Sequence, residues 1–138
     1  MEDTPALAEW IIEQTADAVI YADRSGAIVR WNRAAAALFG YSATETLGQN
    51  LDLIIPEHLR SAHWRGYEAA MASGCTRLHG RATLTRAINK TGHKLYVEMT
   101  FSIVSDPKGE VLGSVAVARD VTARVEREKS VARDGGEM

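Results

Sequence analysis

The 138-residue sequence predicts one α+β domain, a five-stranded antiparallel sheet with helices packed on one face. Strand-like segments occur as a pair near the N-terminus and as a group of three near the C-terminus, with helix-like segments before, between and after them. Residues 94–104 alternate between apolar and polar side chains, which is typical of a half-buried strand. Apolar residues make up 46% of the chain and charged residues 25%, a globular composition.

The N-terminal region predicts a helix followed by a hairpin. Thr4 is a candidate N-cap for a helix over residues 5–14, because proline is tolerated in a first turn. Trp10 on this helix is expected to cover the outer sheet face or to contact a partner subunit. Two apolar runs, 18–23 and 27–32, flank a tight glycine-containing loop and predict two paired strands.

Capping residues predict two short helices after the hairpin. Asn32 suits an N-cap, and Gly40 is positioned to end the helix that Asn32 starts. Ser42 and Glu45 have the spacing of a capping box for a second short helix.

A longer helix is expected over residues 56–74, and its two faces differ. The stripe that we expect to be buried consists of Leu59, His63, Tyr67, Ala70 and Gly74. Trp64 falls on the polar stripe, where an exposed tryptophan more often marks a contact surface. Two interpretations of His63 remain open: a core histidine bonded to a backbone carbonyl, or a metal ligand in an apolar pocket.

The C-terminal half predicts strands over residues 76–86, 94–104 and 111–118, then a mostly polar helix. The resulting division is an N-terminal flanking helix (1–16), a central domain (17–121), and a C-terminal helix with a frayed tail (122–138).

Composition and motifs exclude several functions. The net charge of −2 gives no footprint for nucleic acid, and no apolar run is long enough for a membrane span. The single cysteine, Cys75, suits a reducing compartment and a cytoplasmic location. We expect no enzymatic activity, because phosphate-loop, nucleophile-elbow and HExxH motifs are absent from the sequence.

Two segments, WNRAAAALFGYSATETLGQNL (31–51) and VARDVTAR (117–124), together with the order of elements, resemble PAS domains over roughly residues 10–124. The resemblance implies a PAS fold and a sensory role, with a ligand, a cofactor or nothing in the cavity between helices and sheet. It also implies a homodimer through the N-terminal helix and the outer sheet face, and a signalling partner such as a kinase or regulator.

The segment GQNLDLIIPEHLRSAH (48–63) is most similar to heme-binding oxygen-sensor PAS domains. In these, a histidine seven residues after a proline is the proximal heme ligand, which corresponds here to His63 after Pro56. The resemblance therefore implies heme b and sensing of oxygen, another diatomic gas or redox state. The alternative is a dimerisation or docking module with no cofactor or with a small apolar metabolite. Blue-light PAS photoreceptors need a cysteine where this chain has Leu51, which argues against flavin photochemistry.

A heme site would take its remaining walls from the same helix and from the sheet. The expected residues are Leu59, Tyr67, Leu78, Arg81, Thr83, Met99, Phe101 and Ile103, with Arg77 or His79 near a propionate. Simple alternation would turn Arg81 and Thr83 outward, whereas a bulge at Gly80 would turn both inward.

Overall fold

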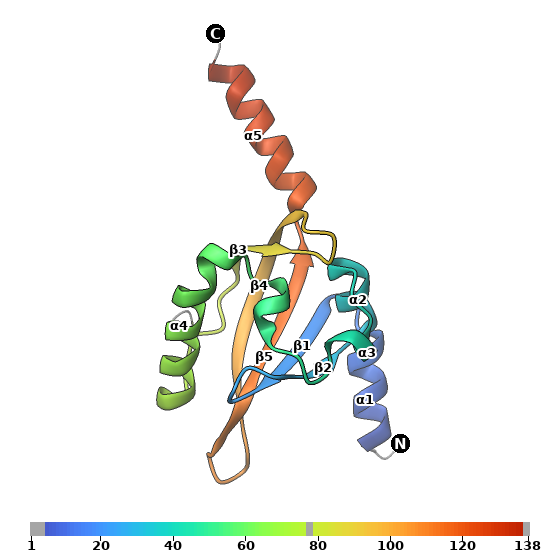
Figure 1. Ribbon diagram of the computed structural model, residues 1–138, viewed down its shortest axis with the longest axis vertical. Helices are drawn as coiled ribbons and strands as arrows, with labels where there is room; N and C mark the ends of the chain where they lie inside the picture. The colour runs from blue at the N-terminus through green and yellow to red at the C-terminus, as the bar shows by residue number, and fades with distance from the viewer. Residues whose placement is uncertain (1–4, 77–78, 137–138) are drawn as a thin grey trace.

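The computed structural model describes residues 5–76 and 79–136, and it has the predicted α+β architecture. Helices lie to one side of a five-stranded antiparallel sheet, and the C-terminal helix projects beyond the sheet (Figure 1). The strands are β1 (Ala18–Asp23), β2 (Ile28–Trp31), β3 (Thr83–Ile88), β4 (Lys94–Ser105) and β5 (Val111–Asp120). The helices are α1 (Pro5–Gln14), α2 (Arg33–Phe39), α3 (Ala43–Thr46), α4 (Arg60–Ser73) and α5 (Thr122–Gly136), with 3-10 turns η1 (Leu51–Ile54) and η2 (Glu57–Leu59).

The sheet brings the N-terminal and C-terminal strands of the sequence side by side. Its strand order is β2-β1-β5-β4-β3, so the last strand pairs with the first. Ile20 lies opposite Ala116, and Ala116 lies opposite Phe101 across the next pair. The hairpin, the middle helices and the C-terminal strands therefore share one buried face.

The helix caps that the sequence predicts are present in the structure. The Asn32 side chain accepts hydrogen bonds from Val19 N (2.9 Å) and Ala35 N (3.0 Å), so it caps α2 and also holds β1. Ser42 and Glu45 form the capping box of α3. Gly40 ends α2 in the left-handed conformation (φ 81°), which glycine adopts without strain.

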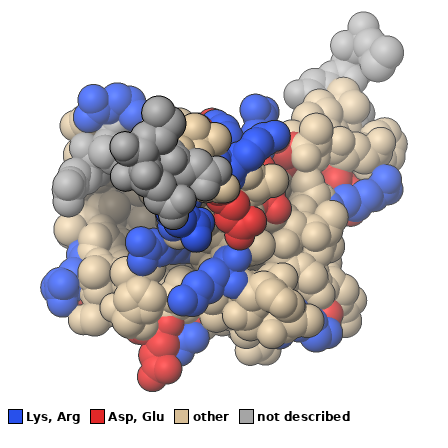
Figure 2. Space-filling model, turned by 90° about the horizontal axis from the view of Figure 1, so that it is seen from above, with Lys and Arg blue, Asp and Glu red and all other residues tan. Residues whose placement is uncertain are grey.

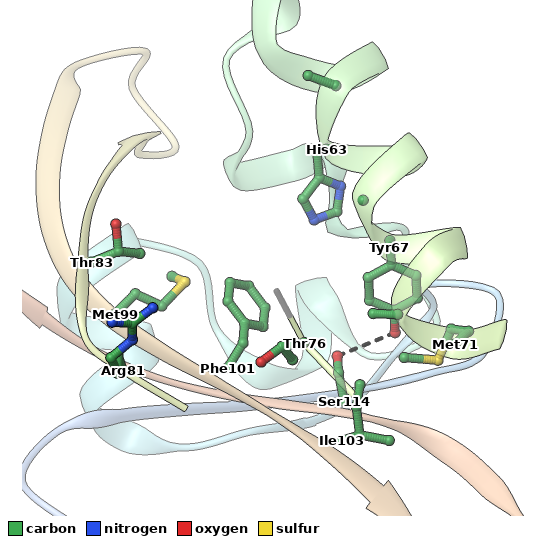
Figure 3. A pocket seen from close by; sticks show the side chains of 13 residues that line it. His63, Tyr67, Met71, Thr76, Arg81, Thr83, Met99, Phe101, Ile103 and Ser114 are labelled. Atoms are coloured by element: carbon green, nitrogen blue, oxygen red, sulfur yellow. Dashed lines mark hydrogen bonds between the residues drawn. The ribbon is translucent and has the colours of Figure 1, made fainter. Parts of the chain in front are cut away.

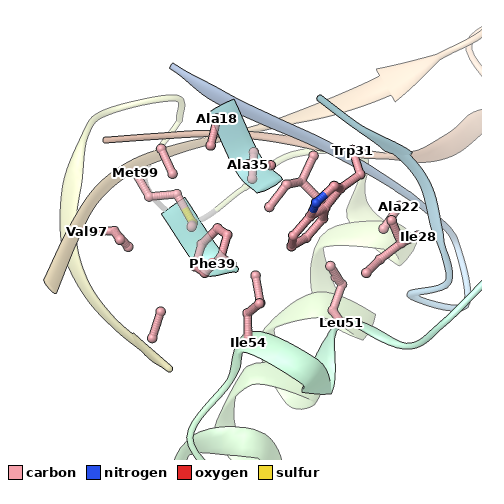
Figure 4. Close-up of a cluster of buried hydrophobic side chains, with 14 of the residues drawn as sticks. Ala18, Ala22, Ile28, Trp31, Ala35, Phe39, Leu51, Ile54, Val97 and Met99 are labelled. Atoms are coloured by element: carbon pink, nitrogen blue, oxygen red, sulfur yellow. The ribbon is translucent and has the colours of Figure 1, made fainter. Parts of the chain in front are cut away.

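The hydrophobic core lies between the sheet and the α2–η1 region (Figure 4). Phe39 and Ile28 are among its largest fully buried side chains, and Phe39 packs against Trp31 with ring centroids 5.5 Å apart. On the other side of the core, α4 is held less closely, since only Tyr67 and Met71 of its 14 residues are buried. This difference leaves space beneath α4.

Two predicted boundaries are wrong. The strand expected over residues 76–86 begins only at Thr83, because a turn containing Gly80 occupies the preceding described residues. The helix expected from Pro56 begins with the 3-10 turn η2, and α4 starts at Arg60.

The flanking helices differ in their contacts. Helix α1 packs beside α2 and the edge strand β2, where Glu9 pairs with Arg30 (2.8 Å), and it leaves Trp10 and Ile11 exposed. Helix α5 buries Val125 near the sheet and exposes Val131. Among the described residues, the helices are too short or too polar to cross a bilayer. Seen from the α5 end, basic side chains are interspersed with acidic and uncharged ones (Figure 2).

Candidate functional site

An apolar hollow of about 230 Å³ lies between α4 and the sheet. His63 and Tyr67 point into it from α4, and Phe101, Ile103 and Ser114 approach from the sheet (Figure 3). The described lining consists of Ala62, His63, Gly66, Tyr67, Ala70, Met71, Thr76, Arg81, Thr83, Met99, Phe101, Ile103 and Ser114. Because strand side chains alternate, Met99, Phe101 and Ile103 share the β4 face that closes the hollow from below.

His63 is the distinctive polar group of this hollow. Its Nδ1 atom is buried and has no hydrogen-bond partner among the described residues. Burial lowers the pKa of His63, while the negative charge of Asp52 opposes that shift in part. The imidazole is therefore predominantly neutral at pH 7, the form that can bind a metal ion.

Trp64 supports His63 from the next position of α4 and is not the exposed contact residue that the helical pattern predicts. Its ring is half-buried against the core and lies over Gly26, where an added Cβ would come within 2.2 Å of the indole. Its Nε1 donates to Asp52 Oδ1 at 2.8 Å. The two ring centroids of His63 and Trp64 are 4.6 Å apart in an edge-to-face arrangement.

Tyr67 lines the hollow one turn after His63. Its hydroxyl donates to the backbone oxygen of Asp23 at 2.6 Å and accepts from Ser114 Oγ at 3.2 Å. Burial is the main cause that raises the pKa of Tyr67, so its hydroxyl stays protonated at neutral pH.

The segment before β3 brings Arg81 and Thr83 to the hollow. Both line it, as the inward register predicts, although the reversal is a turn at His79 (φ 51°) and Gly80 (φ 80°) rather than a bulge inside a strand. Thr83 then pairs with Met99 in the sheet. Arg81 is the only permanently charged side chain in the described lining.

The remaining predicted site residues lie elsewhere. Leu59 is half-buried at the end of η2 and is not in the described lining. Arg77 and Leu78 fall outside the described residues. His79 and Cys75 are exposed and border a shallow surface depression beside Gly80.

A second, smaller hollow of about 70 Å³ adjoins the first on the η1 side. The two share His63, Met99, Phe101 and Ser114, so His63 borders both. Leu51 and Ile54 of η1 form part of the far wall. The apolar space under α4 therefore extends around the imidazole.

Sequence reasoning missed Met71, Thr76 and Ser114. The spacing of Met71 from Tyr67 along the helix was a usable signal, as was the alternation that puts Ser114 with Ala116 and Ala118 on one face of β5. Thr76 gives no such signal, because it lies in the connection after Gly74.

Comparison with known protein families agrees with this architecture. Residues 8–121 match the family model described as the PAS fold. The chain is a PAS domain. Three relatives, one signal transduction kinase and two sensor proteins, contain a similar segment, and the chain spans only 10–21% of their lengths. This PAS domain is a sensory signalling module.

Two of these relatives are from Escherichia coli. The signal transduction histidine-protein kinase AtoS is 28% identical over 96% of this chain, which covers 21% of AtoS. The oxygen sensor protein DosP is 28% identical over 83% of this chain, which covers 14% of DosP. The sensor protein FixL of Bradyrhizobium diazoefficiens is 42% identical over 38% of this chain, which covers 10% of FixL.

Solved structures agree on the fold. The PAS domain of a Colwellia psychrerythraea protein has a TM-score of 0.75 and 20% identity, covering 88% of this PAS domain and 99% of that chain. An RNA-binding light-oxygen-voltage receptor has a TM-score of 0.74 and 28% identity, covering 96% of this PAS domain and 37% of that chain.

Proposed function

We propose that this PAS domain is a non-catalytic sensor that binds heme b through His63 and responds to a diatomic gas or to the redox state of the iron. The observation that carries the proposal is a neutral imidazole that faces an apolar hollow and has no hydrogen-bond partner at its buried Nδ1 among the described residues. The oxygen sensor DosP and the sensor FixL are among its relatives, which favours this ligand over others.

The donor set suits heme better than an isolated metal ion. A structural zinc site needs four protein ligands, whereas heme iron needs one or two axial ligands from the protein. Among the described residues, no group of three or more His, Cys, Asp or Glu side chains is placed to hold a metal ion. When bound, heme would supply an iron atom able to bind a diatomic gas.

The walls of the hollow provide what a porphyrin requires. Met99, Phe101 and Ile103 form an apolar surface beneath His63, and Arg81 supplies one positive charge. The guanidinium of Arg81 could pair with a propionate or donate to a bound diatomic ligand, as charge-assisted hydrogen bonds are the strongest polar contacts in such a site.

The size of the hollow requires α4 to move outward when heme binds. Sites for drug-sized ligands measure roughly 300–1,000 Å³, and this hollow measures about 230 Å³. Helix α4 is the wall best placed to move, because only Tyr67 and Met71 of its 14 residues are buried. The position of α4 would then report whether the site is filled.

The test is hemin titration of the purified domain, followed by gel filtration and an absorbance spectrum. We expect a Soret band that stays with the protein and that is lost or strongly shifted in His63→Ala. His58→Ala is the matched control, because His58 is exposed five residues earlier and should leave the spectrum unchanged. A wild-type protein that emerges without the band would refute heme binding.

A second candidate is a small apolar metabolite bound in the same hollow. The volume of about 230 Å³ favours it, because a ligand of that size would need no movement of α4. Mass spectrometry of ligands released from the purified, hemin-free protein distinguishes the two. A stoichiometric small molecule whose binding does not depend on hemin would support the second candidate.

A further inference from the structure

We propose that the Tyr67 hydroxyl is a positioning group that sets the height of α4, and therefore of His63, above the sheet. We further propose that its contact with Ser114 carries a displacement of α4 to β5. The part of this proposal that concerns heme rests on the proposed function, whereas the part that concerns α4 stands on the protein alone.

We call the hydrogen bonds that the Tyr67 hydroxyl makes with β1 and β5 the hydroxyl tie. Tyr67 donates to the backbone oxygen of Asp23 at the end of β1 (2.6 Å), and it accepts from Ser114 Oγ on β5 (3.2 Å). The backbone oxygen of Ala22 lies 3.4 Å away. The hydroxyl therefore satisfies both its donor and acceptor roles in a buried position, where a lost partner is costly.

Among the described residues, these are the only hydrogen bonds from α4 to the sheet. Two other residues of α4 bond to η1 and the residue that follows it: Arg60 donates to the backbone oxygens of Ile55 and Asp52, and Trp64 donates to the Asp52 carboxylate. Since η1 is itself a short segment rather than part of the sheet, Tyr67 fixes the helix against the rigid layer of the domain.

Tyr67 is also next to the group that it would position. It lies one turn after His63 on the same face of α4, and the two ring centroids are 5.8 Å apart with an angle of 33° between the planes. Both side chains line the 230 Å³ hollow. Any ligand that lifts His63 away from the sheet must therefore stretch or break the hydroxyl tie.

The two strands that Tyr67 contacts, β1 and β5, lie close together at this point. At Gly113, directly before Ser114, an added Cβ would lie 2.1 Å from the backbone oxygen of Ala22 and 2.8 Å from Tyr21 Oη. From Ser114, β5 runs to Asp120, whose carboxylate accepts from Thr122 N at the start of α5 (2.9 Å). The tie thus joins the cavity to the strand that leads into α5.

Hydrogen–deuterium exchange of the ligand-free protein tests the positioning role. In Tyr67→Phe, which keeps the ring and removes the hydroxyl, we expect amides of α4 to exchange roughly tenfold faster. Amides of β3 and β4 should change much less. Tyr41→Phe is the matched control, because no hydrogen bond to the Tyr41 hydroxyl is found among the described residues, and its α4 exchange should match wild type. Unchanged α4 exchange in Tyr67→Phe, or equal acceleration throughout the domain, would overturn the role.

Hemin binding tests the coupling to β5. In wild type, hemin should alter exchange in both α4 and the β5–α5 junction. In Ser114→Ala, the α4 change should remain while the junction change falls at least about threefold. Tyr67→Phe should shift the iron–histidine stretching frequency, which general loss of stability would not do. An identical junction response in Ser114→Ala would overturn the coupling. A wild-type protein that does not bind hemin refutes the proposed function instead, and the ligand-free exchange experiment still decides the role of Tyr67.

Discussion

Asp52 and Trp64 are joined by a hydrogen bond of 2.8 Å between the carboxylate Oδ1 and the indole Nε1. This contact joins η1 to α4, and Arg60 Nε lies 4.0 Å from the same carboxylate oxygen. The same carboxylate influences His63, since its charge favours the protonated imidazole. One acidic residue therefore contacts α4 and also influences the pKa of His63 on the same helix.

Replacing Asp52 with asparagine should lower the pKa of His63 further. The substitution removes the negative charge that opposes the effect of burial, while the amide oxygen can still accept from Trp64. An NMR titration of the His63 ring protons measures the midpoint directly. Glu110→Gln, a charge removal in the exposed β4–β5 turn, serves as the control. An unchanged or higher midpoint in Asp52→Asn would contradict this electrostatic account.

The free energy of unfolding of the wild-type domain should fall on acidification, and part of that fall should come from protonation of His63. Because burial lowers the folded-state pKa, the unfolded chain binds more protons below its ordinary value of about 6.5, and unfolding becomes more favourable there. The contribution is absent well above that pH and cannot exceed ~1.4 kcal/mol per pH unit. Urea unfolding between about pH 7.5 and 5.5 should show a shallower decline for His63→Leu. Parallel curves for the two proteins would show that His63 does not titrate differently on folding.

Asn32→Ala should destabilise the domain by about 3 kcal/mol or more, since several buried partners lose their hydrogen bonds together. The Asn32 amide also donates to the backbone oxygens of Ile12 and Asp17, so the side chain joins α1, β1 and α2. Denaturant unfolding measures the loss. Ser42→Ala, which removes an exposed cap, should cost only ~1 kcal/mol. Equal costs for both variants would show that the network at Asn32 adds nothing beyond an ordinary cap.

Two glycine substitutions should change stability in opposite directions. Gly113→Ala places a Cβ 2.1 Å from the backbone oxygen of Ala22, so the β1–β5 pair must shift, at a cost of at least ~2 kcal/mol. Gly66 lies inside α4 with no atom within 4 Å of an added Cβ, and Gly66→Ala should stabilise the domain by roughly 0.5–1 kcal/mol. Thermal and urea unfolding of both variants test the contrast. A tolerated Gly113→Ala would mean that the strands can separate at this point.

The fold was largely predictable because its local signals agree with its packing. The hairpin, the capping box and the alternation in β4 each require only neighbouring residues, and all three are confirmed. The strand order is different, because pairing of β1 with β5 depends on residues almost one hundred positions apart. The start of β3 was misplaced for a different reason: a local turn at His79 and Gly80 precedes the strand, and apolar content alone did not reveal it.

The site was predictable where helical or strand periodicity sets the direction of a side chain. His63, Tyr67, Met99, Phe101 and Ile103 line the hollow as their spacing predicts. Trp64 was misjudged because helical position puts it beside charged residues, whereas the glycine loop at Gly26 and the carboxylate of η1 provide a place for its ring. Gly26 lies 38 positions before Trp64 and Asp52 lies 12 positions before it, and single-helix periodicity contains no information about either contact.

The attachment of α5 has a mechanical consequence. Its first turn is fixed to β4 by Thr122, whose hydroxyl accepts from Tyr96 N at 2.9 Å. About two turns further on, Lys129 donates to the Tyr96 hydroxyl at 2.6 Å. Beyond these contacts the helix extends away from the sheet (Figure 1). Fifteen helical residues measure roughly 22 Å, so a tilt of about 10° at the base would move the tip by about 4 Å. A small rotation at the base of α5 would therefore produce a much larger displacement of its C-terminal end.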